Sequence, residues 1–106
     1  MQLQLSARHP SVNESVRAYA EKRLAKLERR LPHDAVIGVT FSRERNPSIA
    51  DDHLVEAVVH LKGASPSARE AAPSYEVAVD RIVDKLERQI ERLRDKRVQE
   101  PRRRAS

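Results

Sequence analysis

The sequence contains one stretch that decides its fold: Ser74-Tyr-Glu-Val-Ala-Val-Asp-Arg-Ile-Val-Asp-Lys-Leu-Glu-Arg-Gln-Ile-Glu-Arg-Leu-Arg-Asp-Lys96. At about 100° per residue, its side chains fall into three rows along a helix. The apolar row contains Tyr75, Val79, Ile82, Val83, Leu86, Ile90 and Leu93. The acidic row contains Asp80, Asp84, Glu87, Glu91 and Asp95, and the basic row contains Arg81, Lys85, Arg88 and Arg92. This spacing predicts a helix that buries its apolar row and exposes both charged rows.

The basic row has two interpretations. It is either an ordinary solvated helix face or a surface that contacts a polyanion. Ion pairs along the helix, such as Asp84 with Arg81 or Arg88, add only about 0.2–0.5 kcal/mol each, so stability does not explain the arrangement. This helix alone does not decide between the two interpretations.

The length of 106 residues suits one domain with one modest core. We expect that domain to cover residues 1–96 and to be followed by a basic, disordered tail over residues 97–106. No apolar run is long enough to cross a bilayer, and the first residues lack a signal-peptide pattern. Cysteine is absent, which excludes disulfides and thiolate chemistry. These features favour a cytoplasmic protein with no membrane partner.

The formal net charge is +5, and it is unevenly distributed along the chain. Residues 1–32 carry +4, residues 33–80 carry −4, and residues 81–106 carry +5. If the two basic segments lie on one side of the fold, their fields add, and nucleic acid becomes the leading partner. The only aromatic residues are Tyr19, Phe41 and Tyr75, all at positions that a core would occupy. Base stacking is therefore a poor fit, and binding to phosphates and shape is expected.

The first segments of the chain have alternating and then helical patterns. Residues 2–8 place Leu3, Leu5 and Ala7 on one face, as in a half-buried strand. Ser11 followed by Glu14 is a capping-box pattern, which predicts a helix over residues 12–30 that Pro32 closes. This helix repeats the three rows of the last one.

The middle of the chain predicts further strands. Residues 35–43 and 54–62 alternate apolar and polar side chains, and residues 67–71 are compatible with a short edge strand. The predicted fold class is α+β with the order β-α-β-β-β-α. The sheet is mixed and three- or four-stranded, and both helices pack on one face.

The sequence offers little for catalysis. The four histidines, His9, His33, His53 and His60, lack metal-ligand spacing, and no metal or cofactor is predicted. With two glycines, no phosphate-binding glycine loop can be formed. The carboxylates lie on helix flanks and in a loop rather than in an expected pocket. We do not expect an enzyme.

The candidate site is the basic surface of the two helices. We expect its RNA-binding residues to be Lys22, Arg23, Lys26, Arg29, Arg30, Arg81, Lys85, Arg88, Arg92 and Lys96. Arginine predominates, and its planar guanidinium suits phosphate. The tail arginines are equally well interpreted as a solubilising end.

Two segments resemble the helical signatures of the bacterial ribosome hibernation factors, also called ribosomal subunit interface or sigma-54 modulation proteins. These segments are Val16-Arg-Ala-Tyr-Ala-Glu-Lys-Arg-Leu-Ala-Lys-Leu-Glu28 and Val83-Asp-Lys-Leu-Glu-Arg-Gln-Ile90. The resemblance covers about residues 2 to 97, in the same element order. Relatives differ at the start of the second helix, where this chain has Ser74-Tyr75-Glu76, and in the preceding segment, which proline interrupts here.

The resemblance implies a fold similar to double-stranded-RNA-binding domains and a place on the small ribosomal subunit, next to its RNA and neighbouring proteins. There the protein would cover the decoding region and block messenger and transfer RNA. Arg23, Lys26, Lys85 and Arg88 fall within the matching motifs. The chain is similar to the short hibernation-promoting type and is expected to be a monomer off the ribosome.

Two other functions stay open from the residues. The last helix could pair its apolar row with a partner protein, in which case that row would be exposed in the isolated domain. The protein could also be a generic binder of double-stranded RNA.

Overall fold

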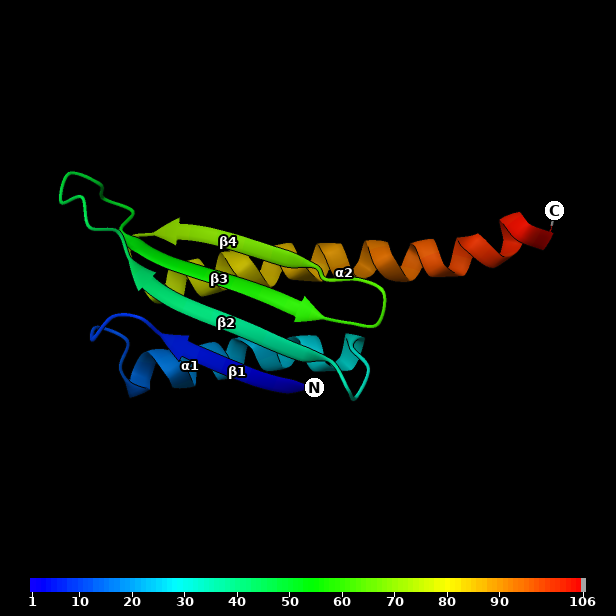
Figure 1. Cartoon of the computed structure of the whole chain (residues 1–106), viewed down its shortest axis with the longest axis horizontal. Helices are drawn as coiled ribbons and strands as arrows, with labels where there is room; N and C mark the ends of the chain where they lie inside the picture. Colours follow the sequence, from blue (N-terminus) through cyan, green and yellow to red (C-terminus); the bar gives the residue numbers. More distant parts are fainter. Residues whose placement is uncertain (106) are drawn as a thin grey trace.

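The computed structural model describes the backbone of residues 1–105 and the side chains of residues 1–95. In chain order the elements are β1 (Gln2–Ala7), α1 (Glu14–Leu24), the 3₁₀ helix η1 (Ala25–Arg30), β2 (Val36–Arg43), β3 (His53–His60), β4 (Ser67–Ala72) and α2 (Tyr75–Ala105). The strands form one sheet in the order β1-β2-β3-β4 (Figure 1).

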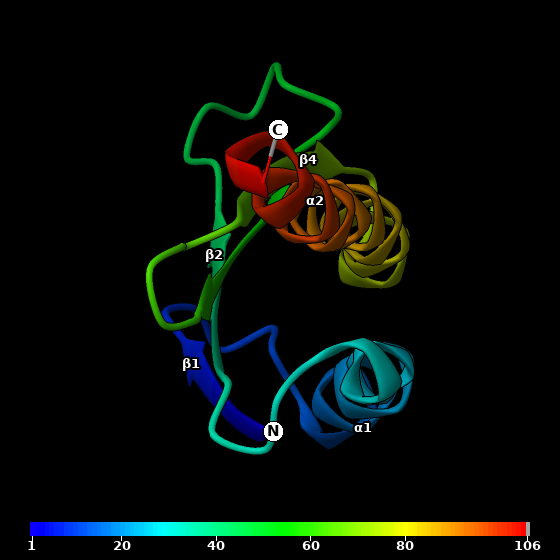
Figure 2. The same ribbon diagram turned by 90° about the vertical axis from the view of Figure 1, so that its right-hand side faces the viewer.

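The sheet is mixed. β1 runs parallel to β2, and the helix α1 connects them, whereas β2, β3 and β4 pair in antiparallel fashion, with a long loop between β2 and β3 and a shorter one between β3 and β4. Both helices cover the same face of the sheet and leave the other face open (Figure 2). The predicted α+β fold is confirmed, and the fourth strand, which the sequence left open, forms one edge of the sheet.

The core lies between the helices and the covered face. From the sheet, Ile37, Val39 and Phe41 of β2 and the alternate apolar residues of β3 are almost completely buried. The apolar row of α2 packs on them from Tyr75 to Ile90. Because this row is already buried within the domain, it does not offer the exposed helix face that a helix-pairing interaction module would need.

The first helix differs in detail from its prediction. Asn13, rather than Ser11, is the N-cap, because its side-chain oxygen accepts a hydrogen bond from the amide of Val16 at 3.0 Å. The expected continuous helix over residues 12–30 ends as an α-helix at Leu24 and continues as η1. A tightened last turn is common before an extended residue, which here is Leu31, directly preceding Pro32.

The second helix begins where the sequence predicts. The hydroxyl of Ser74 accepts a hydrogen bond from the amide of Val77 at 3.2 Å, as an N-cap does. The helical backbone continues to Ala105. The disordered tail expected over residues 97–106 falls on a segment whose side chains lie outside the described residues, and the domain boundary at residue 96 stays a prediction. Within the described chain, no helix has the length and apolar character needed to cross a membrane.

Candidate nucleic-acid interface

The structure places the predicted basic residues on two helices that lie side by side over the sheet (Figure 2). The exposed members of the predicted site are Lys22, Lys26, Arg29, Arg81, Lys85, Arg88 and Arg92, and the half-buried members are Arg23 and Arg30. The side chain of Lys96 lies outside the described residues. The helices therefore bring nine of the ten predicted cations to one side of the sheet, but their surroundings differ.

Two of the cations join the helices to each other. The Nε atom of Arg23 lies 2.8 Å from Oδ1 of Asp80, and Arg30 forms an ion pair with Glu91. The hydroxyl of Tyr19 also donates to Asp80, at 2.8 Å and 3.0 Å from its two carboxylate oxygens. This hydrogen bond, with smaller contributions from burial and from the charge of Asp80, raises the pKa of Tyr19 above its usual value. These groups hold α1 and η1 against α2.

Two further cations connect α2 to the neighbouring strand. Lys85 Nζ lies 2.9 Å from a carboxylate oxygen of Glu70 on β4, and Arg81 donates to the carbonyl oxygen of Ala71 at 3.3 Å. Both side chains remain exposed to solvent, so a phosphate can still approach them. Glu70 nevertheless compensates part of the charge of Lys85, and the carbonyl of Ala71 holds the guanidinium of Arg81 in place.

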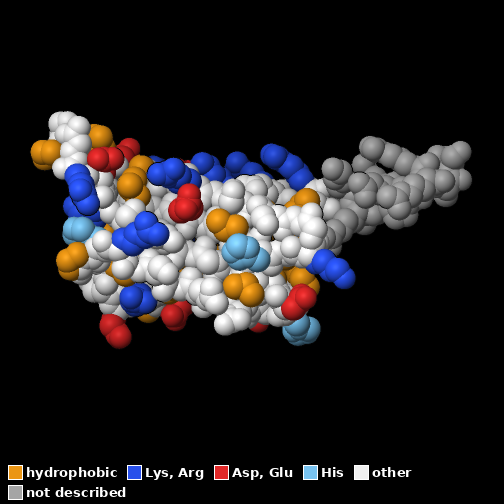
Figure 3. Space-filling model, viewed as in Figure 1, with side chains coloured by type: hydrophobic (Ala, Val, Ile, Leu, Met, Phe, Trp, Pro, Cys, Tyr) orange, Lys and Arg blue, Asp and Glu red, His pale blue; other side chains and the backbone are white. Residues whose placement is uncertain are grey.

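The remaining five exposed cations have no ion pair among the described residues. They are Lys22, Lys26, Arg29, Arg88 and Arg92. We call this set the free basic row. Its members come from both helices, and positively charged side chains also line the edge of the molecule where α2 passes β4 (Figure 3).

The two basic rows do not merge into one uninterrupted surface. The acidic row of α2 faces α1, as its contacts with Arg23 and Arg30 show. Between the helices lies a hollow of ≈ 350 Å³. It is lined by Arg30, Asp84, Glu87, Arg88 and Glu91. A strip of carboxylates therefore separates the basic residues of α1 and η1 from those of α2.

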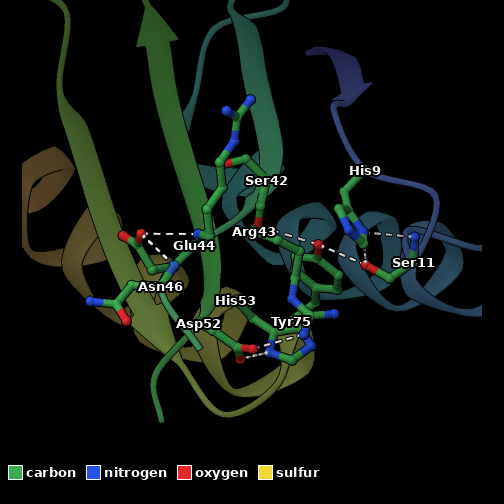
Figure 4. Close-up of polar contacts among 10 residues, drawn as sticks. His9, Ser11, Ser42, Arg43, Glu44, Asn46, Asp52, His53 and Tyr75 are labelled. Carbon is green, nitrogen blue, oxygen red and sulfur yellow. Dashed lines mark hydrogen bonds and ion pairs between the residues drawn. The ribbon is translucent and has the colours of Figure 1, made fainter. Parts of the chain in front are cut away.

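A polar cluster lies around Tyr75, where the first residues of α2 meet the ends of the strands (Figure 4). The hydroxyl of Tyr75 donates to the carbonyl oxygen of Ser42 at 3.2 Å and lies 3.0 Å from the hydroxyl of Ser11, which in turn lies 2.7 Å from Nδ1 of His9. The ring of Tyr75 packs edge to face on His53, with 4.7 Å between the ring centroids. Helical spacing predicted Tyr75 as a core residue, but it gave no sign of these polar partners.

The cluster continues through one carboxylate. Arg43 donates to Asp52 Oδ2 at 2.7 Å, and Nδ1 of His53 lies 2.8 Å from Asp52 Oδ1 (Figure 4). Among the described residues, no group of three or more His, Cys, Asp or Glu side chains is arranged to hold a metal ion. The cluster connects β2, β3, the β1–α1 loop and α2, and this position indicates a structural role.

Domains of known structure share this α+β fold, a four-stranded mixed sheet with two helices on one face. The N-terminal domain of Thermus thermophilus Protein Y superposes with a TM-score of 0.71 and 30% identity, covering 88% of this chain and 99% of that domain. A ribosomal subunit interface protein from Coxiella burnetii superposes with a TM-score of 0.72 over 90% of this chain and 99% of that chain; at 22% identity it supports the fold alone.

The chain belongs to the family described as sigma 54 modulation protein / S30EA ribosomal protein, whose profile matches residues 3–98. It is similar to the ribosome hibernation promoting factor of Azotobacter vinelandii, with 26% identity over 99 residues that cover 93% of this chain and 88% of that protein. The resemblance found in the two helical segments is thus confirmed. The family comprises ribosome hibernation factors, which are not enzymes.

Proposed function

We propose that this protein silences ribosomes by binding the RNA of the small subunit at the decoding region, where it excludes messenger and transfer RNA. The single observation that supports this most directly is the free basic row, five exposed cations that no carboxylate of the described chain neutralises. Exposed Arg and Lys side chains bind phosphates without reading sequence, which suits a folded ribosomal RNA. The protein acts in the cytoplasm, where ribosomes are.

The arrangement of charge favours folded RNA over a simple rod. The carboxylates between the helices repel a phosphate backbone that crosses the hollow directly, whereas RNA strands that follow the basic rows of α1 and α2 separately avoid this repulsion. A surface with two basic rows and an acidic strip fits RNA segments that diverge, as they do in a folded ribosomal site. This is the physical reason for preferring an intact subunit to a naked duplex as the target.

The first prediction concerns Arg88 and Arg92, which are exposed and unpaired within the described chain. Replacing both with glutamate should abolish cosedimentation with small subunits, because two attractive contacts with phosphate become repulsive. The matched control replaces Arg8 and Arg45 with glutamate. These residues are also exposed and unpaired in the described chain, and the net charge changes equally.

We expect the control variant to sediment with the subunits as the unchanged protein does. Equal loss in both variants would mean that only net charge matters and would reject the proposed surface. Competition adds a second readout: if naked duplex RNA displaces the protein as efficiently as intact subunits do, the protein is a generic binder of double-stranded RNA instead.

A further inference from the structure

The two edge strands of the sheet differ, because side chains of α2 cover the edge formed by β4. The amide side chain of Gln89 on α2 accepts from the backbone amide of Ser67 at 3.1 Å and donates to the carbonyl oxygen of the same residue at 2.6 Å. Arg81 donates to the carbonyl oxygen of Ala71. Side chains of α2 therefore bond to the outward amide and carbonyl of Ser67 and to the outward carbonyl of Ala71, and such cover is a common way to prevent further strand pairing.

The opposite edge, formed by β1, has no such cover. The amides of Gln2 and Arg8 donate to the carbonyl oxygens of Ala35 and Phe41, both at 2.8 Å. Because backbone groups alternate in direction along a strand and the register with β2 is continuous, the even-numbered residues bond to β2. The amides and carbonyls of Leu3, Leu5 and Ala7 therefore point outward, and no residue of the described chain bonds to them.

The sequence of β1 also lacks the usual protection of an edge strand. Residues 2–7 contain no charged residue and no proline, and the strand has no bulge against β2. Three outward donors and three outward acceptors remain available at regular spacing. Such an edge is a template for an added strand.

The charge beside this edge indicates what kind of chain it accepts. Arg23 and Arg30 face α2. The opposite flank of α1 and η1 therefore points away from α2, in the same direction as the free edge of β1 (Figure 2). On that flank the seven-residue spacing places Glu14 and Glu21 of α1 in one row, and Glu28 of η1 follows along the chain. All three are exposed, and none forms an ion pair within the described chain. Among the described residues, Arg17 is the cation that helical spacing places on this flank of α1, so the helix side chains there carry a net negative charge.

We propose that the β1 edge binds an extended basic segment of a partner protein, which adds a fifth strand to the sheet. Its backbone would pair with Leu3, Leu5 and Ala7, and every second side chain would point toward the helix layer, where lysine or arginine meets the row of glutamates. The proposal lies beyond the RNA surface, because it uses the other side of α1.

A second copy of this chain is a poorer occupant. Twofold pairing of two β1 strands would bring the acidic flank of one α1 toward the same flank of the other. Like charges at such short distance oppose association. The charge beside the edge therefore selects a basic partner of different sequence.

The test uses nuclear magnetic resonance on the full chain with a short capped peptide in which lysine alternates with threonine. On peptide addition we expect the amide hydrogens of Leu3, Leu5 and Ala7 to become protected from exchange, while those of Gln4 and Ser6 are protected already. Two control peptides share the length: one replaces lysine with glutamate, and the other carries N-methyl groups on every second backbone amide. Neither should protect the three amides.

Variants of the protein distinguish the contribution of backbone pairing to peptide binding from that of charge. Ala7→Pro removes one outward donor without removing a bond to β2, and it should weaken peptide binding about tenfold. Ala71→Pro makes the same change at the outward side of β4 and should leave peptide binding unchanged.

Glu14→Gln with Glu21→Gln should weaken binding of the lysine peptide and reduce its salt dependence. The Arg88→Glu, Arg92→Glu protein should bind the peptide normally.

Four results would overturn the proposal. They are no protection of the three amides by the lysine peptide, equal binding of the glutamate peptide, equal binding to the Ala7→Pro protein, and protection that rises with protein concentration alone together with a dimer in sedimentation. The last result would identify the edge as a contact between two copies.

Discussion

Asp52 illustrates how a single carboxylate fixes a loop. It follows the long β2–β3 connection and bonds to Arg43 across the two strand ends, with His53 on its other oxygen. The hydrogen bond from Arg43 lowers the pKa of Asp52, partial burial opposes this shift, and the charges of Arg43 and His53 reinforce it. Because its pKa is lower in the folded state, ionised Asp52 stabilises the fold above the pKa it has when unfolded, about 4.

This contribution is lost as the pH falls below about 4 and through the folded-state pKa. We expect Asp52→Asn to lower the free energy of unfolding at neutral pH and to lower it less at an acidic pH below the folded-state pKa, measured by urea denaturation at both values. Asp51→Asn is the control, since Asp51 is exposed and has no partner in the described chain. An equal loss at both pH values would show that Asp52 acts through packing instead of charge.

The residues of this cluster were visible in the sequence, but their proximity was not. From the sequence, the aspartates were placed in a loop outside any expected pocket, and the histidines lacked metal-ligand spacing. Asp52 is nine residues from Arg43, and Tyr75 is 64 residues from Ser11, so no local spacing connects them. Only the pairing of β2 with β3 and the packing of α2 bring them together.

Among the elements, α2 and β4 are joined by the amide of Gln89. Replacing Gln89 with alanine removes both hydrogen bonds to Ser67 and should lower the free energy of unfolding by about 0.5–1.5 kcal/mol. Arg88→Ala, at an exposed position of the same helix, should change it by less than about 0.5 kcal/mol. Urea denaturation measures both. If the two variants have the same stability, solvent replaces the Gln89 amide without cost and the β4 edge needs no cover.

The elements themselves follow closely from periodicity. The strands expected over 35–43 and 54–62 are observed as Val36–Arg43 and His53–His60, and the possible strand over 67–71 is observed as Ser67–Ala72. The differences arise at ends, where a few hydrogen bonds decide. Asn13 caps α1 in place of Ser11 because Ser11 is engaged with His9 and Tyr75, and the latter contact exists only in the folded chain.

For the whole molecule, the proposed binding through the free basic row predicts a salt dependence. If each of its five side chains neutralises one phosphate, the logarithm of ribosome affinity should fall against the logarithm of salt concentration with a slope of about −4. Fluorescence titration of labelled protein with small subunits at several salt concentrations gives the slope. The Arg8→Glu, Arg45→Glu control should retain it. Affinity that does not respond to salt would contradict a phosphate-binding surface.

The candidate site was only partly accessible from the sequence. Helical spacing identified every member of the free basic row, because exposed positions on an amphipathic helix follow from its buried row. From this spacing we expected the basic rows of the two helices to lie together, whereas carboxylates of α2 occupy the space between them. The spacing also could not tell that Arg23, Arg30 and Lys85 have carboxylate partners.

The sequence by itself determined the amphipathic helices, the order of the elements and the family, since these depend on patterns among neighbouring residues. The tertiary structure alone decided which cations are neutralised and which strand edge is left open. Ion pairs and edge coverage depend on atoms from segments far apart in the chain, and their distances are set by how the helices pack on the sheet. The charges counted along the chain therefore predicted one basic surface. Their positions in the fold divide that surface into two parts, with carboxylates of α2 between them.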